Sequence, residues 1–255
     1  MVGGILQELE VYPIGRGGKV NRPVLLRNAA LAGMIGPALF ALIVVVLTVA
    51  QYGSMVDLGW DPIGASDVPW PSGLALGPLG WLQVVNFILL GLALMVFAVG
   101  LHRGVAARVR GSVIGPVFLV AAGVALVLSA FKTDPSLSGG PQSWHGLVHG
   151  LAFLLLVSSL LLSLLFLWWR LRRDPLWRGY DLYTIITAVL YVVFFLSASQ
   201  LAFYLFLAVV LVWVEVMQTG CAPSLRAQGH SNPRVWSEHP RVGAYSVGTS
   251  RHPNA

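Results

Sequence analysis

Residues 141–161 read PQSWHGLVHGLAFLLLVSSLL, and they indicate where a long apolar helix begins. Ser143 suits the N-cap position, Pro141 precedes it, and the chain from Leu147 to Trp169 contains no Asp, Glu, Lys or Arg. A helix of that length is long enough to cross the apolar core of a bilayer, which is about 30 Å thick. The stretch therefore predicts a membrane-spanning helix that starts at a polar rim.

Two histidines lie at that rim. His145 and His149 are four residues apart, so on a helix they share one face. Two imidazoles at this spacing can share one metal ion while loop carboxylates complete its coordination, or they can relay a proton. Zinc is the candidate metal, with His145, His149 and Asp134 as ligands. The alternative is a hydrogen-bond network at the rim, with Asp134 only setting a turn before Pro135.

The composition defines the class of protein. Of 255 residues, 56% are hydrophobic and 10% are charged, against about 25% charged residues in ordinary soluble domains. The apolar residues form long uncharged runs, which predict an all-α, polytopic transmembrane helical bundle. Cys221 is the only cysteine, and this excludes an internal disulfide and a cysteine-cluster metal site. The expected partner is the lipid bilayer, and no nucleic acid partner is expected.

The uncharged runs predict six membrane spans. The last run, residues 182–214, would be about 50 Å long as one helix, so it must fold back at residues 197–200. The spans together form a transmembrane domain at 29–217, between a cytoplasmic arm at 1–28 and a disordered cytoplasmic tail at 218–255. The first four spans are expected at residues 29–51, 79–101, 112–131 and 147–169.

The basic residues predict the orientation. Arg and Lys gather in the arm, in the loop after residue 101 and after residue 169, and Lys132 alone lies on the opposite side. Because basic residues mark the cytoplasmic side, both termini are expected inside a multi-pass protein of the plasma membrane. The tryptophans are expected in two interfacial belts, with Trp60, Trp70, Trp81 and Trp144 in the outer one and Trp168, Trp169, Trp177 and Trp213 in the inner one.

Polar residues near the predicted outer face form the candidate site. Lipid cannot pair buried amides or imidazoles, so such groups are expected to face the interior of the bundle. For Gln83 and Asn86, the alternative is that they only join neighbouring helices. We expect one polar cavity, open to the outer face and lined by Ser72, Gln83, Asn86, Asp134, His145 and His149.

These residues also carry a family resemblance. The stretch SGLALGPLGWLQVVNFILLGLAL at 72–94, the stretch FKTDP at 131–135, and His145-Gly146 with His149 resemble the bacterial and archaeal membrane family called domain of unknown function 998. The resemblance covers about residues 30–215. It implies a six-helix or similar bundle with a polar cluster at the outer face, and the family has no established activity to carry over.

A fainter likeness points to membrane hydrolases of the alkaline ceramidase and adiponectin-receptor type. Those proteins use a serine, an aspartate and a His-x-x-x-His pair around zinc, parts that Ser72, Asp134, His145 and His149 would take here. The chain departs from that group in having six predicted spans and not seven, and in the position of its histidine pair. It also lacks a third histidine on the predicted outer side.

Three classes of function follow. The favoured one is a membrane protein that binds or moves a small molecule or lipid. The alternatives are a zinc-dependent membrane hydrolase and an assembly or sensor subunit, so whether the protein is an enzyme stays open. Transport would favour broken helices, for which Gly36-Pro37 and Gly115-Pro116 are the candidate positions.

Overall fold

The computed structural model describes residues 22–64, 66, 68–104, 113–135, 143–197 and 199–229. Within these ranges the chain is helical and contains no strand, which confirms the predicted all-α class. The predicted arm before residue 22, the basic loop at 105–112 and the tail after residue 229 lie outside the described residues.

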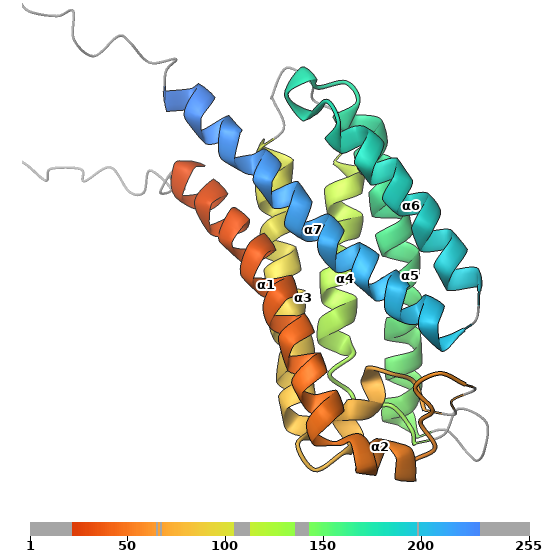
Figure 1. The fold of residues 1–255 in the computed structure, drawn as a ribbon. Helices are drawn as coiled ribbons and strands as arrows, with labels where there is room; N and C mark the ends of the chain where they lie inside the picture. Colours follow the sequence, from red (N-terminus) through yellow and green to blue (C-terminus); the bar gives the residue numbers. More distant parts are fainter. Residues whose placement is uncertain are drawn as a thin grey trace, which may run out of the picture.

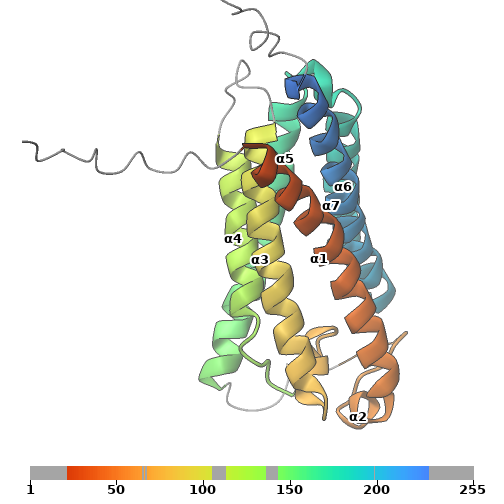
Figure 2. The same cartoon turned by 90° about the vertical axis from the view of Figure 1, so that its left-hand side faces the viewer.

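Six α-helices run between the two ends of an elongated bundle (Figure 1). Each packs against the next in chain order, and the last packs against the first, so together they form a closed ring. Figure 2 shows α1, α3 and α4 along one side of this ring. The six helices are α1 (Arg22–Ala50), α3 (Gly80–Gly104), α4 (Ile114–Leu128), α5 (Trp144–Leu171), α6 (Tyr180–Leu196) and α7 (Gln200–Gly229).

Three short elements complete the fold. They are α2 (Tyr52–Asp57), the 3₁₀ helix η1 (Ser72–Leu76) and the 3₁₀ helix η2 (Pro175–Trp177). The start of α1 and the end of α7 lie at one end of the bundle, the terminal end (Figure 1). The opposite end, the loop end, holds α2, η1, the first turn of α5 and the turn between α6 and α7. That turn lies between Leu196 and Gln200, where the sequence predicted it.

Four helices are long and apolar enough to cross a membrane. The stretches are Arg27–Ala50, Gly80–Arg103, Trp144–Leu171 and Gln200–Gly220, whereas α4 and α6 are apolar but only 15 and 17 residues long. Large apolar side chains are exposed on the outer faces of the helices, among them Leu42 and Val49 of α1, Leu154 of α5 and Val189 of α6. Such a continuous apolar exterior is the surface that a lipid environment covers.

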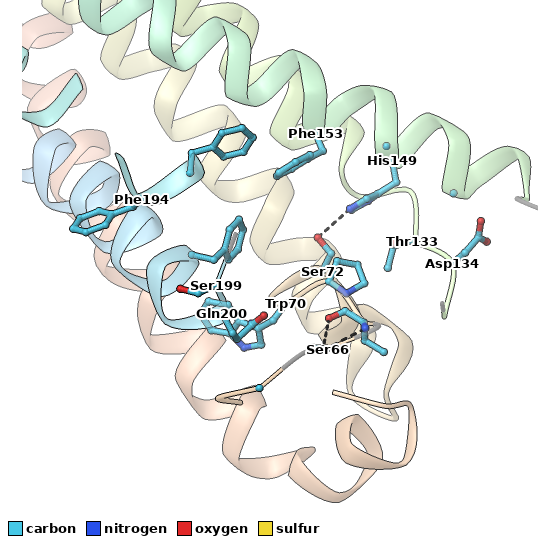
Figure 3. A pocket seen from close by; sticks show the side chains of 17 residues that line it. Ser66, Trp70, Ser72, Thr133, Asp134, His149, Phe153, Phe194, Ser199 and Gln200 are labelled. Carbon is cyan, nitrogen blue, oxygen red and sulfur yellow. Dashed lines mark hydrogen bonds between the residues drawn. The ribbon is translucent and has the colours of Figure 1, made fainter. Parts of the chain in front are cut away.

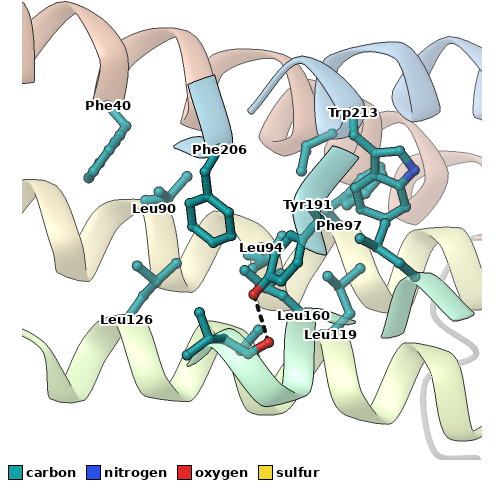
Figure 4. Close-up of a cluster of buried hydrophobic side chains, with 14 of the residues drawn as sticks. Phe40, Leu90, Leu94, Phe97, Leu119, Leu126, Leu160, Tyr191, Phe206 and Trp213 are labelled. Atoms are coloured by element: carbon teal, nitrogen blue, oxygen red, sulfur yellow. Dashed lines mark hydrogen bonds between the residues drawn. The ribbon is translucent and has the colours of Figure 1, made fainter. Parts of the chain in front are cut away.

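Aromatic and aliphatic side chains from all six helices fill the ring (Figure 4). Tyr191 is buried there and donates its hydroxyl hydrogen bond to the carbonyl oxygen of Val157 at 2.7 Å. Trp213 is also buried, and its indole N–H donates to the hydroxyl of Thr184 at 3.1 Å.

Not all tryptophans of the two expected interfacial belts are exposed. Trp81 and Trp144 are exposed, but Trp60, Trp177 and Trp213 are only 5%, 1% and 1% exposed. These three rings pack inside the protein, so their faces are not presented to lipid head groups as the expected belts required. Trp177, for example, lies against the ring of Tyr180 and against Gly220.

Three positions differ from the predicted helix breaks and ends. Pro37 lies inside α1 and the helix continues through it, so the candidate break at Gly36-Pro37 was wrong. Pro116 falls in the first turn of α4, where its missing N–H costs no helical hydrogen bond. α7 continues to Gly229, beyond the predicted end of the last span at residue 217.

Gln51 holds the connection between α1 and α3 in place. It is buried, its Nε2 donates to the carbonyl oxygen of Leu74 at 3.2 Å, and its Oε1 accepts from the backbone N–H of Leu79 at 2.8 Å. Trp70 adds a hydrogen bond from its indole N–H to the Thr48 hydroxyl at 3.1 Å. These contacts fold the segment back onto the end of the bundle and bring Ser72 inward.

Glycines allow a close helix contact between α3 and α4. A Cβ added at Gly91 would collide with the carbonyl oxygen of Gly123, and one at Gly123 would collide with the side chain of Met95 and the carbonyl oxygen of Gly91. The obstacles include backbone atoms, which cannot move without shifting a whole helix.

We expect Gly123→Ala to destabilise the bundle by about 1–3 kcal/mol, because an extra methyl group at this contact forces the helices apart. The measurement is thermal unfolding of the purified protein in a non-ionic detergent. Gly53→Ala in α2 is the matched control, since a Cβ there meets no atom within 4 Å. Equal melting temperatures for the two variants would contradict this account of the contact.

Candidate functional site

A cavity of about 520 Å³ lies at the loop end of the bundle (Figure 3). Its wall comes from the segment before η1, from the segment between α4 and α5, from the first turns of α5 and from the turn between α6 and α7. The polar and aromatic residues that line it are Ser66, Trp70, Ser72, Thr133, Asp134, His149, Phe153, Phe194, Phe195, Ser199, Gln200 and Phe203.

His149 forms the centre of the polar wall. Its Nδ1 lies 2.7 Å from the carbonyl oxygen of Phe131 and 3.1 Å from that of Ser129. Carbonyl oxygens only accept hydrogen bonds, so Nδ1 carries the proton, and in the neutral ring Nε2 is an acceptor. The hydroxyl of Ser72 therefore donates to Nε2, across 3.0 Å. Sequence spacing gave no sign of this pair, because the two residues are 77 positions apart.

Asp134 binds the start of α5. Its Oδ2 accepts from the backbone N–H of Ser143 at 3.1 Å, and its Oδ1 accepts from the Ser143 hydroxyl at 2.5 Å. Ser143 is the N-cap, as predicted, because its Oγ accepts from the backbone N–H of Gly146. The hydrogen bond from the Ser143 hydroxyl, aided by its backbone N–H and by His145, lowers the pKa of the Asp134 carboxyl below its usual value.

His145 belongs to this capping network. Its Nδ1 lies 2.8 Å from the Ser143 hydroxyl and 3.1 Å from the carbonyl oxygen of Lys132, and 4.0 Å from Oδ1 of Asp134. Its side chain is 42% exposed and does not line the cavity. The two histidines thus have different roles, since one lies in the capping network and the other in the cavity wall.

Gln83 and Asn86 lie elsewhere. Both are buried, and Asn86 donates from Nδ2 to the carbonyl oxygen of Phe40 at 3.2 Å and to Oε1 of Gln83 at 3.3 Å. This contact joins α3 to α1, and neither amide is among the residues that line the cavity. Of the six residues expected in one cavity, the structure brings together Ser72, Asp134 and His149.

Sequence reasoning missed several residues of the cavity wall. Gln200 was assigned only to a turn, yet it lines the cavity, and its Nε2 is buried without a hydrogen-bond acceptor among the described residues. Trp70 was assigned only to the outer belt, and Phe153 and Phe203 gave no signal because aromatic residues occur throughout an apolar sequence. Trp70 packs edge-on against Tyr204 of α7, with ring centroids 4.6 Å apart.

A second cavity, of about 90 Å³, adjoins the first on the side of the middle of the ring. It is lined almost wholly by apolar side chains from α1, α3, α4, α5 and α7, including Phe87, Leu126, Leu156, Val157 and Leu211. We call it the axial cavity. Four residues line both spaces, namely Ser72, His149, Phe153 and Phe203.

The zinc hypothesis requires several ligands close together. Among the described side chains, no three His, Cys, Asp or Glu residues come together in a group that could hold a metal ion. In the described structure both ring nitrogens of His149 are engaged in hydrogen bonds, Nδ1 with the carbonyl oxygen of Phe131 and Nε2 with the hydroxyl of Ser72. Zinc stays a prediction from the histidine spacing, and metal analysis of the purified protein tests it.

The fold and the site define a class of protein. A closed ring of helices, with four of them long and apolar enough to cross a bilayer and with polar groups gathered at one end, is the architecture of an integral membrane protein. The family described as "Protein of unknown function (DUF998)" matches residues 70–221, more than half of the chain. The chain belongs to this family, as its motifs predicted.

The family match begins at Trp70, so the resemblance expected for residues 30–69 lies outside it. The match includes Ser72, Asp134 and His149. No curated protein and no solved structure gives a significant match to the chain. The likeness to membrane hydrolases of the alkaline ceramidase and adiponectin-receptor type therefore gains no support.

The lowered pKa of Asp134 predicts a pH-dependent stability. A carboxyl whose pKa is lower in the folded state stabilises the fold above its unfolded pKa of about 3.9, and this contribution is lost as pH falls through the folded pKa. Asp134→Asn should therefore lower the melting temperature at neutral pH, and the difference from wild type should disappear in acid. Melting in a non-ionic detergent, from about pH 3 to pH 7, measures it. A difference that is constant across that range would contradict the capping role.

Proposed function

We propose that the protein binds an amphiphilic small molecule or lipid, with its polar group in the larger cavity and its hydrocarbon chain in the axial cavity. The observation that carries this proposal is that the two cavities adjoin, because Ser72, His149, Phe153 and Phe203 line both. We call this place the junction. A ligand that occupies both cavities meets hydroxyl, imidazole and carboxylate groups at one end and mainly apolar side chains at the other.

The polar part of the cavity suits a neutral or weakly polar head group. Asp134 contributes a carboxylate to its wall, and Ser72, Thr133 and Ser199 contribute polar side chains. No described Lys or Arg lines it, so an anionic head group would find no opposite charge there.

The axial cavity suits an alkyl chain. A water-sized group needs about 10–15 Å³, so the axial cavity has room for several methylene groups in line. Its walls offer few hydrogen-bonding groups apart from Ser72, Ser129 and His149, so water gains little by entering it. Burial of each methylene group there contributes about 0.8 kcal/mol to binding.

The orientation in the membrane belongs to the same proposal. We infer six crossings, with both termini in the cytoplasm and the loop end facing outward from the plasma membrane. Arg103 lies in the last turn of α3, and Arg172, Arg173 and Arg178 follow α5, all at the terminal end. Asp57, Asp61 and Asp134 lie at the loop end. This charge distribution is typical of a cytoplasmic terminal end.

Ligand binding is tested with a monoalkyl glycerol ether that carries a photoreactive diazirine in its chain. We expect the probe to label peptides of α5 and α7 that line the axial cavity. Leu156→Trp should weaken labelling about tenfold, because the larger ring fills the space that the chain needs. Leu154→Trp is the matched control, since Leu154 is 61% exposed on the outer face of the same helix.

Equal labelling of the two tryptophan variants would show that the probe binds the outer surface and not the cavity, and would overturn the proposal. Such a result would favour the alternative of an assembly or sensor subunit. About one zinc per chain, lost when His145 and His149 are replaced by alanine, would instead favour the zinc-dependent hydrolase.

The orientation is tested with single cysteines in a Cys221→Ser background. We expect a membrane-impermeant maleimide to label Asp57→Cys in intact cells and to label Arg172→Cys only after the cells are opened. Both positions are exposed, so accessibility to the reagent depends on the side of the membrane alone. Labelling of Arg172→Cys in intact cells would contradict the proposed orientation.

A further inference from the structure

We propose that Ser72 and His149 act as a nucleophile and its general base, and that the protein hydrolyses an acyl ester whose hydrocarbon chain lies in the axial cavity. This inference rests on the proposed function, because the ester must first bind across the junction of the two cavities. It differs from the zinc hypothesis in needing no metal.

The geometry of the pair matches what nucleophilic catalysis requires. A serine hydroxyl becomes a nucleophile when a base lies about 2.6–3.2 Å away and a third group orients that base. Here Ser72 Oγ and His149 Nε2 are 3.0 Å apart, and the carbonyl oxygens of Phe131 and Ser129 hold Nδ1. These carbonyl groups keep the proton on Nδ1, so Nε2 is free to accept the serine proton.

The imidazole has little freedom to leave this geometry. His149 is 7% exposed, and its ring packs edge-on against Phe87 of α3 with centroids 6.4 Å apart. Four parts of the chain thus meet at the pair: η1 supplies the hydroxyl, α5 the base, the segment after α4 the orienting carbonyls and α3 the packing surface. A base held in this way is already oriented for the reaction before substrate binds.

The position of the pair selects the bond that it would attack. Ser72 and His149 line both the polar cavity and the axial cavity, so they lie where a polar head group meets a hydrocarbon chain. In an acyl ester the carbonyl carbon occupies that same place, between the chain and the alcohol. Gly150, one residue beyond His149, also lines the polar cavity, and a Cβ there would meet no atom within 4 Å, so this part of the wall is open.

The reaction balances with water as the only co-reactant. Ser72 Oγ bonds to the ester carbonyl carbon while His149 Nε2 takes the hydroxyl proton. The bond from that carbon to the alcohol oxygen then breaks, and Nε2 returns the proton to the departing alcohol. Water attacks the resulting acyl-serine with Nε2 as base, the bond between Oγ and the acyl carbon breaks, and the proton returns to Ser72, leaving a free carboxylic acid.

The pair is tested first with an alkyl fluorophosphonate, which forms a bond from phosphorus to an activated serine oxygen and releases fluoride. We expect one adduct per chain, located at Ser72 by mass spectrometry of the digested protein. Ser72→Ala should abolish the adduct, and His149→Gln should slow its formation at least about 100-fold.

Ser143→Ala is the matched control, because the Ser143 hydroxyl also lies 2.8 Å from a histidine nitrogen but is not among the residues that line the cavity. This variant should form the adduct at Ser72 at the wild-type rate. An adduct at Ser143, or none in the wild-type protein, would overturn the assignment. Melting temperatures of all variants show whether a loss of labelling reflects unfolding, and Ser72→Ala removes only one oxygen atom.

The second measurement is release of fatty acid from a monoacyl glycerol ester by the full-length protein in vesicles. We expect turnover by wild type and Ser143→Ala, and a rate at least about 100-fold lower for Ser72→Ala. The glycerol ether probe, which cannot be hydrolysed, should still label Ser72→Ala. If the ether labels the axial cavity but the ester is not hydrolysed, catalysis is overturned and binding stands. If the ether does not label the axial cavity and the ester is not hydrolysed, both the proposed binding and the proposed catalysis are overturned.

Discussion

The described structure depends on one constraint: in a lipid environment, polar groups of the backbone and the side chains must find partners inside the protein. Helices satisfy most of their own backbone groups, so a buried polar side chain finds its acceptor in the second lone pair of a carbonyl oxygen on a neighbouring helix. Asn86 of α3 donates to a carbonyl of α1, Ser163 of α5 to a carbonyl of α4, and Tyr191 of α6 to a carbonyl of α5. These hydrogen bonds join successive helices at defined heights, so they set the register in which apolar side chains fill the ring.

His149 follows the same constraint just beyond the C-terminal end of α4. Ser129 is the C-cap of this helix and Phe131 lies two residues further on, so their carbonyl groups have no helical partner. The imidazole N–H of His149 satisfies the carbonyls of Ser129 and Phe131, and this leaves its other nitrogen directed at Ser72. A structural requirement of the bundle thus prepares an imidazole with a defined tautomer at the wall of a cavity.

The two ends of the bundle differ because different groups close them. At the loop end, Gln51 and Trp70 fold the connection between α1 and α3 inward, while Asp134 and Ser143 cap α5. At the terminal end, Arg170 is buried and bonds to the backbone carbonyl and the ring of His102 across from α5 to α3. The loop end holds hydroxyl, carboxylate and imidazole groups beside a cavity, so it is the end where a ligand finds varied polar partners.

The sequence by itself determined the class of protein, the apolar helices, the turn after Leu196, the N-cap at Ser143 and the family, because each depends on residues that are close in the chain or on composition. It did not determine which polar residues meet. Helical spacing pairs His145 with His149, yet a helix that begins at a rim places one in the capping network and the other, one turn further, against α4.

The pair of His149 with Ser72, the burial of Trp177 and Trp213, and the separation of Gln83 and Asn86 from the cavity were decided only by the tertiary structure. Each depends on how the ring closes and on where the connection from α1 to α3 folds back. That closure is set by contacts between residues far apart in the chain. Examples are the close backbone approach of Gly91 to Gly123 and the hydrogen bond from the Gln51 side chain to the carbonyl oxygen of Leu74. Periodicity along one helix contains no information about such contacts.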